Sequence, residues 1–251
     1  MLAVLVFFNL LEALAENLLT MAPALGIANT KKYIIPLVSD LIKNSPAEVR
    51  LALLKNLDGL QDLVEFEEIS THLTEAIKQL TYDKRWRIRM NILNNVSTIA
   101  KVIGTTIFQE KFSSLYLSNL DDSVFAVREA TIKNLKGLVD ILGVDWIESH
   151  AFHKLLSYKT HTNYLYRLNP LFAIFILAPA LSKDFLEKTI TPFILNQVAD
   201  KIPNIRFNVA KCLKVLSPLI KNVSLQSAIG KALSQLASDF DPEVKYFASK
   251  D

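Results

Sequence analysis

Two histidines are the residues in this sequence whose type and spacing could hold a metal ion. His150 and His153 are three residues apart in a stretch expected to be helical, so their side chains could face one way, and Glu148 lies nearby. A zinc site needs three or four ligands, and no further ligand recurs at a suitable spacing. We therefore expect surface histidines, with no metal and no other cofactor. A metal-dependent enzyme that uses this pair is the alternative, which metal analysis of the purified chain would test.

The sequence lacks the signatures of other catalytic chemistries. It contains no glycine-rich phosphate loop, no G-x-S-x-G and no H-E-x-x-H. Six glycines among 251 residues also argue against glycine-punctuated β folds. The single cysteine, Cys212, excludes a disulfide framework and fits a reducing compartment. With 51% apolar residues the chain is expected to fold, and we predict that it is not an enzyme.

One cluster of cations surrounds a tryptophan. It covers Lys84–Arg89, and an indole beside guanidinium groups suits either nucleic acid or an acidic protein surface. The cluster occurs once and the net charge is only +3, so a continuous basic track for a phosphate backbone is not expected. We therefore expect no nucleic-acid partner.

The elements that position these residues repeat every 39 residues. A β-branched or aromatic residue followed by a cation recurs at this step, and the cations are Arg50, Arg89, Arg128, Arg167, Arg206 and Lys245. An apolar column keeps the same step: Leu18, Leu57, Val96, Leu135, Ile174 and Leu213. Within a unit the apolar positions lie three to five residues apart, which is typical of one face of a helix.

Each unit is interpreted as two helices joined by a short polar turn. The first helix precedes the cation pair, as in Tyr33–Ile42, Ile69–Leu80 and Phe112–Leu120. A helical hairpin of this length fits the HEAT and armadillo range. We predict an all-α, right-handed α-solenoid of HEAT hairpins, which forms one continuous domain. Its full units are 27–65, 66–104, 105–143, 144–182 and 183–221, with partial units at 1–26 and 222–251.

The apolar start of the chain, Met1–Phe8, is similar to a secretory signal. No cation precedes it, and Asn9 and Glu12 interrupt the apolar run, so it is too short to span a bilayer. Leu10 and Met21 fall in the columns of a second helix. We expect the exposed edge of a repeat, a chain that is a fragment or a short member of a longer array, and no membrane partner.

An acidic column lies six residues before the cations. An aspartate in the turn can cap the second helix by accepting backbone N–H bonds, and it can pair with a cation of the next unit. Because stacking needs the same charges in every repeat, we interpret both columns as a structural ladder. The ladder consists of Asp83, Asp122, Asp200 and Asp239 with Arg50, Arg89, Arg128, Arg167 and Arg206, and His161 replaces one aspartate.

A third column lies three residues before the cations and reads Ala47, Trp86, Phe125, Tyr164, Pro203 and Pro242. We expect it in the turn just before the second helix, outside the core. Aromatic residues repeated there suit a protein interface, in which Trp and Tyr are frequent anchors. The alternative is that these rings stack on neighbouring turns.

Several strings carry a resemblance to a known family: Pro46–Leu51, Lys84–Arg89, Ala126–Ala130, Asn163–Arg167, Arg206–Lys211 and Val244–Ala248. They resemble the C-terminal half of the HEAT-repeat scaffold (A) subunit of type 2A serine/threonine protein phosphatase. The resemblance covers nearly the whole chain, in register from about Leu10. Leu10-Leu11, in place of a cation pair, and His161 depart from the family pattern.

The resemblance implies a non-catalytic scaffold whose C-terminal repeats hold the phosphatase catalytic subunit on the ridge of turns between helices. The implied binding residues are Trp86, Arg87, Phe125 and Tyr164, joined on the same ridge by Val124, Asn163, Ile202 and Pro203. A regulatory subunit would bind repeats that this chain lacks, and we expect a cytoplasmic location that extends to the nucleus. The alternative is a HEAT or armadillo transport adaptor, which would carry recurring charges along the second helices and bind cargo with steep salt dependence.

Overall fold

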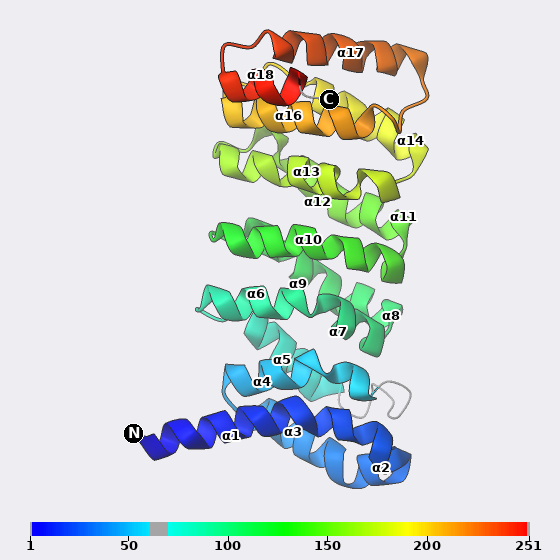
Figure 1. The fold of residues 1–251 in the computed structure, drawn as a ribbon. Coiled ribbons are helices and arrows are strands. Elements are labelled where there is room, and N and C mark those ends of the chain that lie inside the picture. The colour runs from blue at the N-terminus through cyan, green and yellow to red at the C-terminus, as the bar shows by residue number, and fades with distance from the viewer. Residues whose placement is uncertain (1, 61–69, 250–251) are drawn as a thin grey trace. The chain divides into compact units, whose positions relative to one another are not determined.

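The computed structural model describes residues 2–60 and 70–249, with the side chains of 6–60 and 73–249. Within these ranges every regular element is a helix or a helical turn, which confirms the all-α class. The chain divides into two compact units, Met1–Ile141 and Leu142–Asp251, and each is described by itself (Figure 1).

The first unit consists of successive helical hairpins. Its helices are α1 (Leu2–Leu18), α2 (Ala22–Asn29), α3 (Ile35–Asn44), α4 (Ala47–Lys55), α5 (Ser70–Thr81), α6 (Trp86–Asn94), α7 (Val96–Ile103), α8 (Thr105–Ile107), α9 (Ser113–Ser118) and α10 (Phe125–Leu142), whose last residue belongs to the second unit. We call the helix before each turn helix A and the helix after it helix B. Thus α5 is a helix A, and α6 with α7 forms the helix B that follows it.

The second unit continues the same pattern. Its helices are α11 (Val144–Trp146), α12 (His153–Leu156), α13 (Tyr164–Leu177), α14 (Lys183–Phe185), α15 (Thr191–Leu195), α16 (Pro203–Leu216), α17 (Val223–Ala237) and α18 (Pro242–Ser249). In this unit α13, α16 and α18 are helices B. They lie next to one another, with α16 between the other two (Figure 1).

Several helices A contain a π-helical turn, which the spacing of apolar residues did not predict. The turns are η2 (Thr30–Ile34), η5 (Phe108–Phe112), η7 (Ile147–Phe152) and η10 (Leu186–Ile190), and their starts fall on the 39-residue step. The first and fifth residues of every turn are buried, so the inserted residue keeps both parts of helix A facing the core. The stretches expected to be helical over Tyr33–Ile42 and Phe112–Leu120 are helical, with π-helical or 3-10 turns at their ends, and Ile69 lies outside the described residues.

The core consists of the apolar columns that repeat along the sequence. Leu18, Leu57, Val96, Leu135, Ile174 and Leu213 are all buried. In the equivalent column of the helices A, Val38, Ile77, Tyr116, Leu155 and Ile194 are buried as well. Burial of one equivalent side chain per hairpin produces a core that continues from hairpin to hairpin within each unit.

The first hairpin exposes apolar side chains that later hairpins bury. Leu10 is 65% exposed, whereas its equivalent Val49 is 1% exposed. Met21 is likewise exposed and its equivalent Leu60 is buried. Within the described residues, Val6–Asn44 is long and apolar enough to cross a membrane by length and composition. In this structure Gly26, with φ of +73°, interrupts the helical backbone of that stretch.

Glycine lies at two of the junctions where a helix B ends and the next helix A begins, and the backbone requires it there. Gly104 has φ of +82° and Gly143 has φ of +85°, a left-handed region that side chains with a Cβ rarely adopt. Open space surrounds the position where a Cβ at Gly104 would lie, so backbone strain rather than a clash fixes the residue type.

We expect Gly104→Ala to lower the free energy of unfolding by about 1 kcal/mol, because alanine would be held at positive φ. The matched control is Gly230→Ala, since Gly230 lies inside α17 with open space around it. That change should instead raise stability by about 0.5–1 kcal/mol. Urea titration of both variants makes the measurement. Equal effects of the two substitutions would contradict the role assigned to Gly104.

Candidate protein-binding surface

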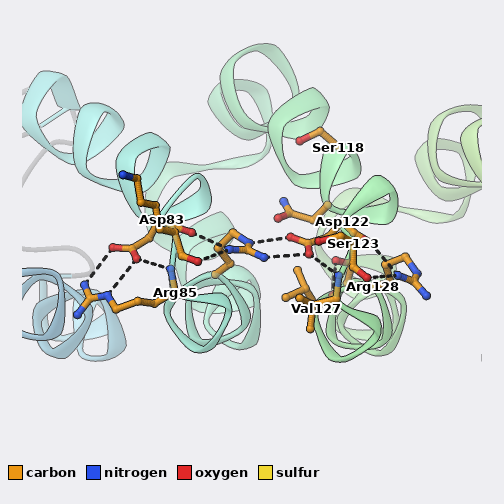
Figure 2. Close-up of polar contacts among 12 residues, drawn as sticks. Asp83, Arg85, Ser118, Asp122, Ser123, Val127 and Arg128 are labelled. Atoms are coloured by element: carbon orange, nitrogen blue, oxygen red, sulfur yellow. Dashed lines mark hydrogen bonds and ion pairs between the residues drawn. The ribbon is translucent and has the colours of Figure 1, made fainter.

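The aspartates of the acidic column order the turn that leads into helix B. Oδ1 of Asp83 accepts the backbone N–H of Arg85 at 2.8 Å, and Oδ1 of Asp122 accepts that of Val124 at 2.8 Å (Figure 2). Asp200 and Asp239 repeat the bond at 2.9 Å. Each bond spans two residues and ends before the helix begins, so the aspartate closes a turn and does not cap helix B. The expected capping role is corrected in this respect.

An arginine of helix B connects two turns at once. Nη1 of Arg89 donates to the backbone oxygen of Asp83 in its own turn at 2.7 Å. The same guanidinium bonds both carboxylate oxygens of Asp122 in the next turn, with Nε to Oδ2 at 2.7 Å and Nη2 to Oδ1 at 2.9 Å. A bidentate, charge-assisted pair of this kind fixes geometry as well as charge.

The second unit repeats this bridge twice. Arg167 bonds Asp200 at 3.0 Å, and Arg206 bonds Asp239 at 2.6 Å through Nε and 2.8 Å through Nη2. In each case the aspartate pairs with the cation of the preceding hairpin. The expectation that each aspartate pairs with a cation of the next hairpin is therefore wrong in direction. The arginine side chain extends from its own helix B toward the turn of the following hairpin, so it meets the aspartate there.

Electrostatics agrees with this geometry. The side chains of Arg89 and Asp122 are only 14% and 9% exposed, so solvent screens the pair weakly. The hydrogen bond from Arg206 holds the pKa of the Asp239 carboxyl below its usual range. The same bond raises the pKa of the Arg206 guanidinium.

The ladder changes at its first position. Arg50 bonds the side chain of Gln79, and Asp83 pairs with Arg85, two residues further along its own turn. Arg85 also pairs with Glu48 of the preceding hairpin. The hydrogen bond from Arg85 is the main reason why the pKa of Asp83 is lowered. Different residues therefore connect the two hairpins here, in place of an Arg50–Asp83 pair equivalent to Arg89–Asp122.

His161 performs the turn-closing part of the aspartate role. Its Nδ1 accepts the backbone N–H of Asn163 at 3.1 Å, and Nη1 of Arg167 donates to its backbone oxygen at 3.0 Å. The ring also stacks on Tyr166, with centroids 4.4 Å apart. Arg128 makes the matching bond within the first unit, from Nη1 to the backbone oxygen of Asp122 at 2.7 Å (Figure 2).

The aromatic column lies at the first residue of helix B. Helices α4, α6, α10, α13, α16 and α18 begin at Ala47, Trp86, Phe125, Tyr164, Pro203 and Pro242. The prediction that these residues lie in the turn is wrong by one position. The bonds of the preceding aspartate end the turn at the residue before, and proline fits the first helical position because its missing N–H needs no partner there.

In the first unit this column forms a surface with cationic and aromatic character. Trp86 is half-buried, and the guanidinium of the exposed Arg87 lies 4.5 Å from the centre of its ring. Phe125 is 44% exposed and Val124 is half-buried. The Arg89–Asp122 pair joins the two turns that carry these four residues. The structure thus brings Trp86, Arg87, Val124 and Phe125 to adjacent turns.

The second unit carries the other four predicted residues. Asn163 is exposed, and its side chain caps α13 by accepting the N–H of Leu165 at 3.0 Å. Tyr164 and Ile202 are half-buried and Pro203 is exposed. The Arg167–Asp200 pair joins the turns that hold them. The predicted ridge is therefore seen as two sets of four residues, one set on each unit.

The histidine pair shows no metal-site geometry among the residues that the structure describes. No group of three or more His, Cys, Asp or Glu side chains that could hold an ion occurs in that part of the chain. His150 stacks on Trp146 with centroids 5.5 Å apart, and its Nδ1 lies 2.8 Å from the Ser149 hydroxyl. Burial raises the pKa of the Cys212 thiol to about 12, so that thiol is protonated and unreactive near neutral pH.

Sequence reasoning missed a second set of links between hairpins. Glu148 accepts the backbone N–H of Ser182 at 2.7 Å, and Glu187 accepts the backbone N–H of Lys221 and Asn222 at 3.1 Å. Both glutamates lie in π-helical turns and bond the start of the next helix A. Their spacing of 39 residues was the available signal.

These features define the class of protein as an all-α array of HEAT-type hairpins that presents a repeated column at the start of each helix B. A solved structure of the same fold, the crystal structure of Cex1p, matches 85% of this chain and 43% of its own with a TM-score of 0.54 and 17% identity. The chain belongs to the family described as "PIK3R4-like, middle domain", which matches residues 22–158.

Curated relatives confirm the resemblance to phosphatase subunits. The A-type regulatory subunit of protein phosphatase PP2A from Schizosaccharomyces pombe is 51% identical over 67 residues, which are 27% of this chain and 11% of the relative. Its namesake from Saccharomyces cerevisiae is 37% identical over 123 residues, 46% of this chain and 19% of the relative. Human serine/threonine-protein phosphatase 4 regulatory subunit 1 is 24% identical over 95% of this chain and 26% of its own length. The chain thus spans about a tenth to a quarter of the relatives it matches.

We expect Asp122→Asn to lower the free energy of unfolding by about 2 kcal/mol. The amide can still accept the turn bond from Val124, but the guanidinium of Arg89 loses its charged partner in a mostly buried position. The matched control is Asp184→Asn, which breaks the exposed i,i+4 pair with Lys188. That control should leave stability essentially unchanged. Thermal and urea unfolding compare the two variants, and equal stability of both with the wild type would show that the bridge is not structural.

Proposed function

We propose that this chain is a non-catalytic scaffold segment that binds the catalytic subunit of a type 2A or type 4 protein serine/threonine phosphatase. The observation that carries the proposal is sequence similarity: parts of this chain, and nearly all of it in one case, align with proteins named as regulatory subunits of those phosphatases. The resemblance of Lys84–Arg89 and Asn163–Arg167 to the family motifs adds the expected contact points. Because the chain spans a minor part of each relative, the regulatory subunit of the assembled enzyme would bind other repeats of a longer protein.

The proposed contact surface is the first turn of successive helices B. Trp86 offers a large ring that is only half-buried, and Arg87 stacks on it with its guanidinium exposed. A guanidinium held in this way loses little conformational entropy when it bonds a carboxylate of the phosphatase. Phe125 extends the apolar area on the next turn. Aromatic residues with arginine at their edge are typical of the energetic centre of a protein interface.

Interactions within the scaffold itself hold the contact residues in place, and these residues take no part in the phosphatase reaction. The turns that carry Trp86 and Phe125 are joined by the Arg89–Asp122 pair, so two hot-spot rings are held in one arrangement before the partner arrives. The corresponding set in the second unit is Asn163, Tyr164, Ile202 and Pro203. We further propose that the protein works in the cytoplasm and the nucleus, which fits its single, reduced cysteine.

We expect Trp86→Ala and Arg87→Ala each to weaken binding of the purified phosphatase catalytic subunit by about 2 kcal/mol, because each removes a central contact. The matched control is Phe240→Ala, since Phe240 is a fully exposed ring that precedes α18 but lies outside the aromatic column. Calorimetry with catalytic subunits of both phosphatase types makes the comparison, and circular dichroism verifies folding. Wild-type affinity in both test variants would refute the assigned surface, and absence of binding by the wild-type chain would refute the function.

A further inference from the structure

The outward faces of α13, α16 and α18 in the second unit carry apolar side chains that the fold does not bury. Phe175 on α13 is 48% exposed and Tyr246 on α18 is 53% exposed. Phe207 of α16 is half-buried. We call this surface the aromatic face and define it as Phe175, Phe207, Lys211, Lys214, Tyr246 and Phe247.

These residues share one surface because they occupy equivalent places in successive hairpins. Phe207 and Tyr246 are related by the 39-residue step, and so are Phe175 and Lys214. Helix α16 packs against both α13 and α18 (Figure 1). Equivalent positions on neighbouring parallel helices of a repeat point to the same side. Phe175 therefore lies beside Lys214, and Tyr246 beside Phe207, on one side of the second unit.

A lysine is fixed within the aromatic face by two rings. Nζ of Lys211 lies 4.8 Å from the centre of the Phe207 ring and 4.0 Å from that of Phe247. The two rings stack with centroids 5.3 Å apart, and Tyr246 meets Phe247 edge-on at 5.2 Å. The contacts order the ammonium group without neutralising it, since aromatic rings carry no net charge. Lys211 is thus a preorganised cation set among apolar groups.

The charge of this surface is positive. Along α13, α16 and α18 the two arginines, Arg167 and Arg206, are already paired with Asp200 and Asp239. The remaining charged residues of these helices, as far as the structure describes them, are Lys211, Lys214, Lys245 and Glu243. Lys245 occupies the place of Arg206, in the cation column of the ladder. Lys211 and Lys214 lie on the aromatic face, and these two cations favour an acidic partner.

The first unit shows that the fold does not require this chemistry. On α10 the equivalent of Lys211 is Lys133, which pairs with Glu129 at 2.8 Å. Lys136 occupies the place of Phe175 and Lys214. The same columns therefore form a polar, partly self-neutralised surface there. Exposed aromatic groups in the second unit are better explained by binding than by stacking.

We propose that the aromatic face is a docking surface for an acidic protein segment whose carboxylates alternate with aromatic or aliphatic side chains. The apolar side chains of the segment cover Phe175 and Tyr246, and its carboxylates bond Lys211 and Lys214. This surface is separate from Tyr164 and Pro203, the first residues of α13 and α16 that we assign to the phosphatase. It therefore provides a second attachment point on the same hairpins.

A library of random 12-residue peptides, displayed on phage and selected against the full chain, tests the proposal. We expect enriched peptides that combine Asp or Glu with aromatic or aliphatic residues. Lys211→Glu and Phe175→Ser should each weaken a selected peptide by roughly tenfold in fluorescence anisotropy, because they reverse a charge or remove apolar area. Circular dichroism and thermal unfolding verify that both variants stay folded.

The matched control is Lys133→Glu, which reverses the equivalent charge on α10 and should leave peptide binding unchanged. Trp86→Ala should also leave it unchanged, so the outcome is independent of phosphatase binding. The proposal is overturned if no acidic peptide is enriched or if selected peptides bind Lys211→Glu as tightly as wild type. It is overturned too if Lys211→Glu alters self-association in sedimentation, or binding to phosphatidylserine vesicles, in place of peptide binding.

Discussion

A single arginine near the start of helix B joins two turns, and the arrangement of neighbouring hairpins depends on that bridge. Its guanidinium donates to the backbone of its own turn and to the aspartate of the next turn, as Arg89 does with Asp83 and Asp122. Apolar burial drives stacking but has little directional preference. The planar, five-donor guanidinium adds direction, because both sets of bonds form only when consecutive turns lie at one distance and orientation.

The bridge also explains where a binding surface can form. The aspartate closes the turn through the backbone N–H two residues on, so helix B starts at a fixed place and its first residue lies at the surface. Trp86 and Phe125 occupy that place on turns joined by the Arg89–Asp122 pair. A structural column of charges and a binding column of aromatics can therefore coexist in one short segment, since one faces the neighbouring turn and the other faces solvent.

The sequence was sufficient for the helical class, the repeat length and the buried columns, because each depends on regular spacing of apolar residues. Three features were beyond it. The π-helical turns leave the spacing of Phe108 and Phe112 compatible with an ordinary helix. The direction of the Asp–Arg pairing depends on where the guanidinium of Arg89 extends. The replacement of the Arg50–Asp83 pair depends on competition from Gln79 and Arg85. The site residues were located by column, but the position of the aromatic column at the first residue of helix B, and not in the turn, required the structure.

Hydrogen–deuterium exchange of the full chain, with and without a purified type 2A phosphatase catalytic subunit, tests the central claim most directly. Backbone N–H groups in the first turn of a helix lack helical partners, so they exchange readily unless a partner covers them. We expect slower exchange on binding at the starts of α6 and α10, around Trp86 and Phe125, with little change at the Gly104 junction. Unchanged exchange at both starts in the presence of bound catalytic subunit, or protection confined to the junctions, would contradict the proposed binding surface.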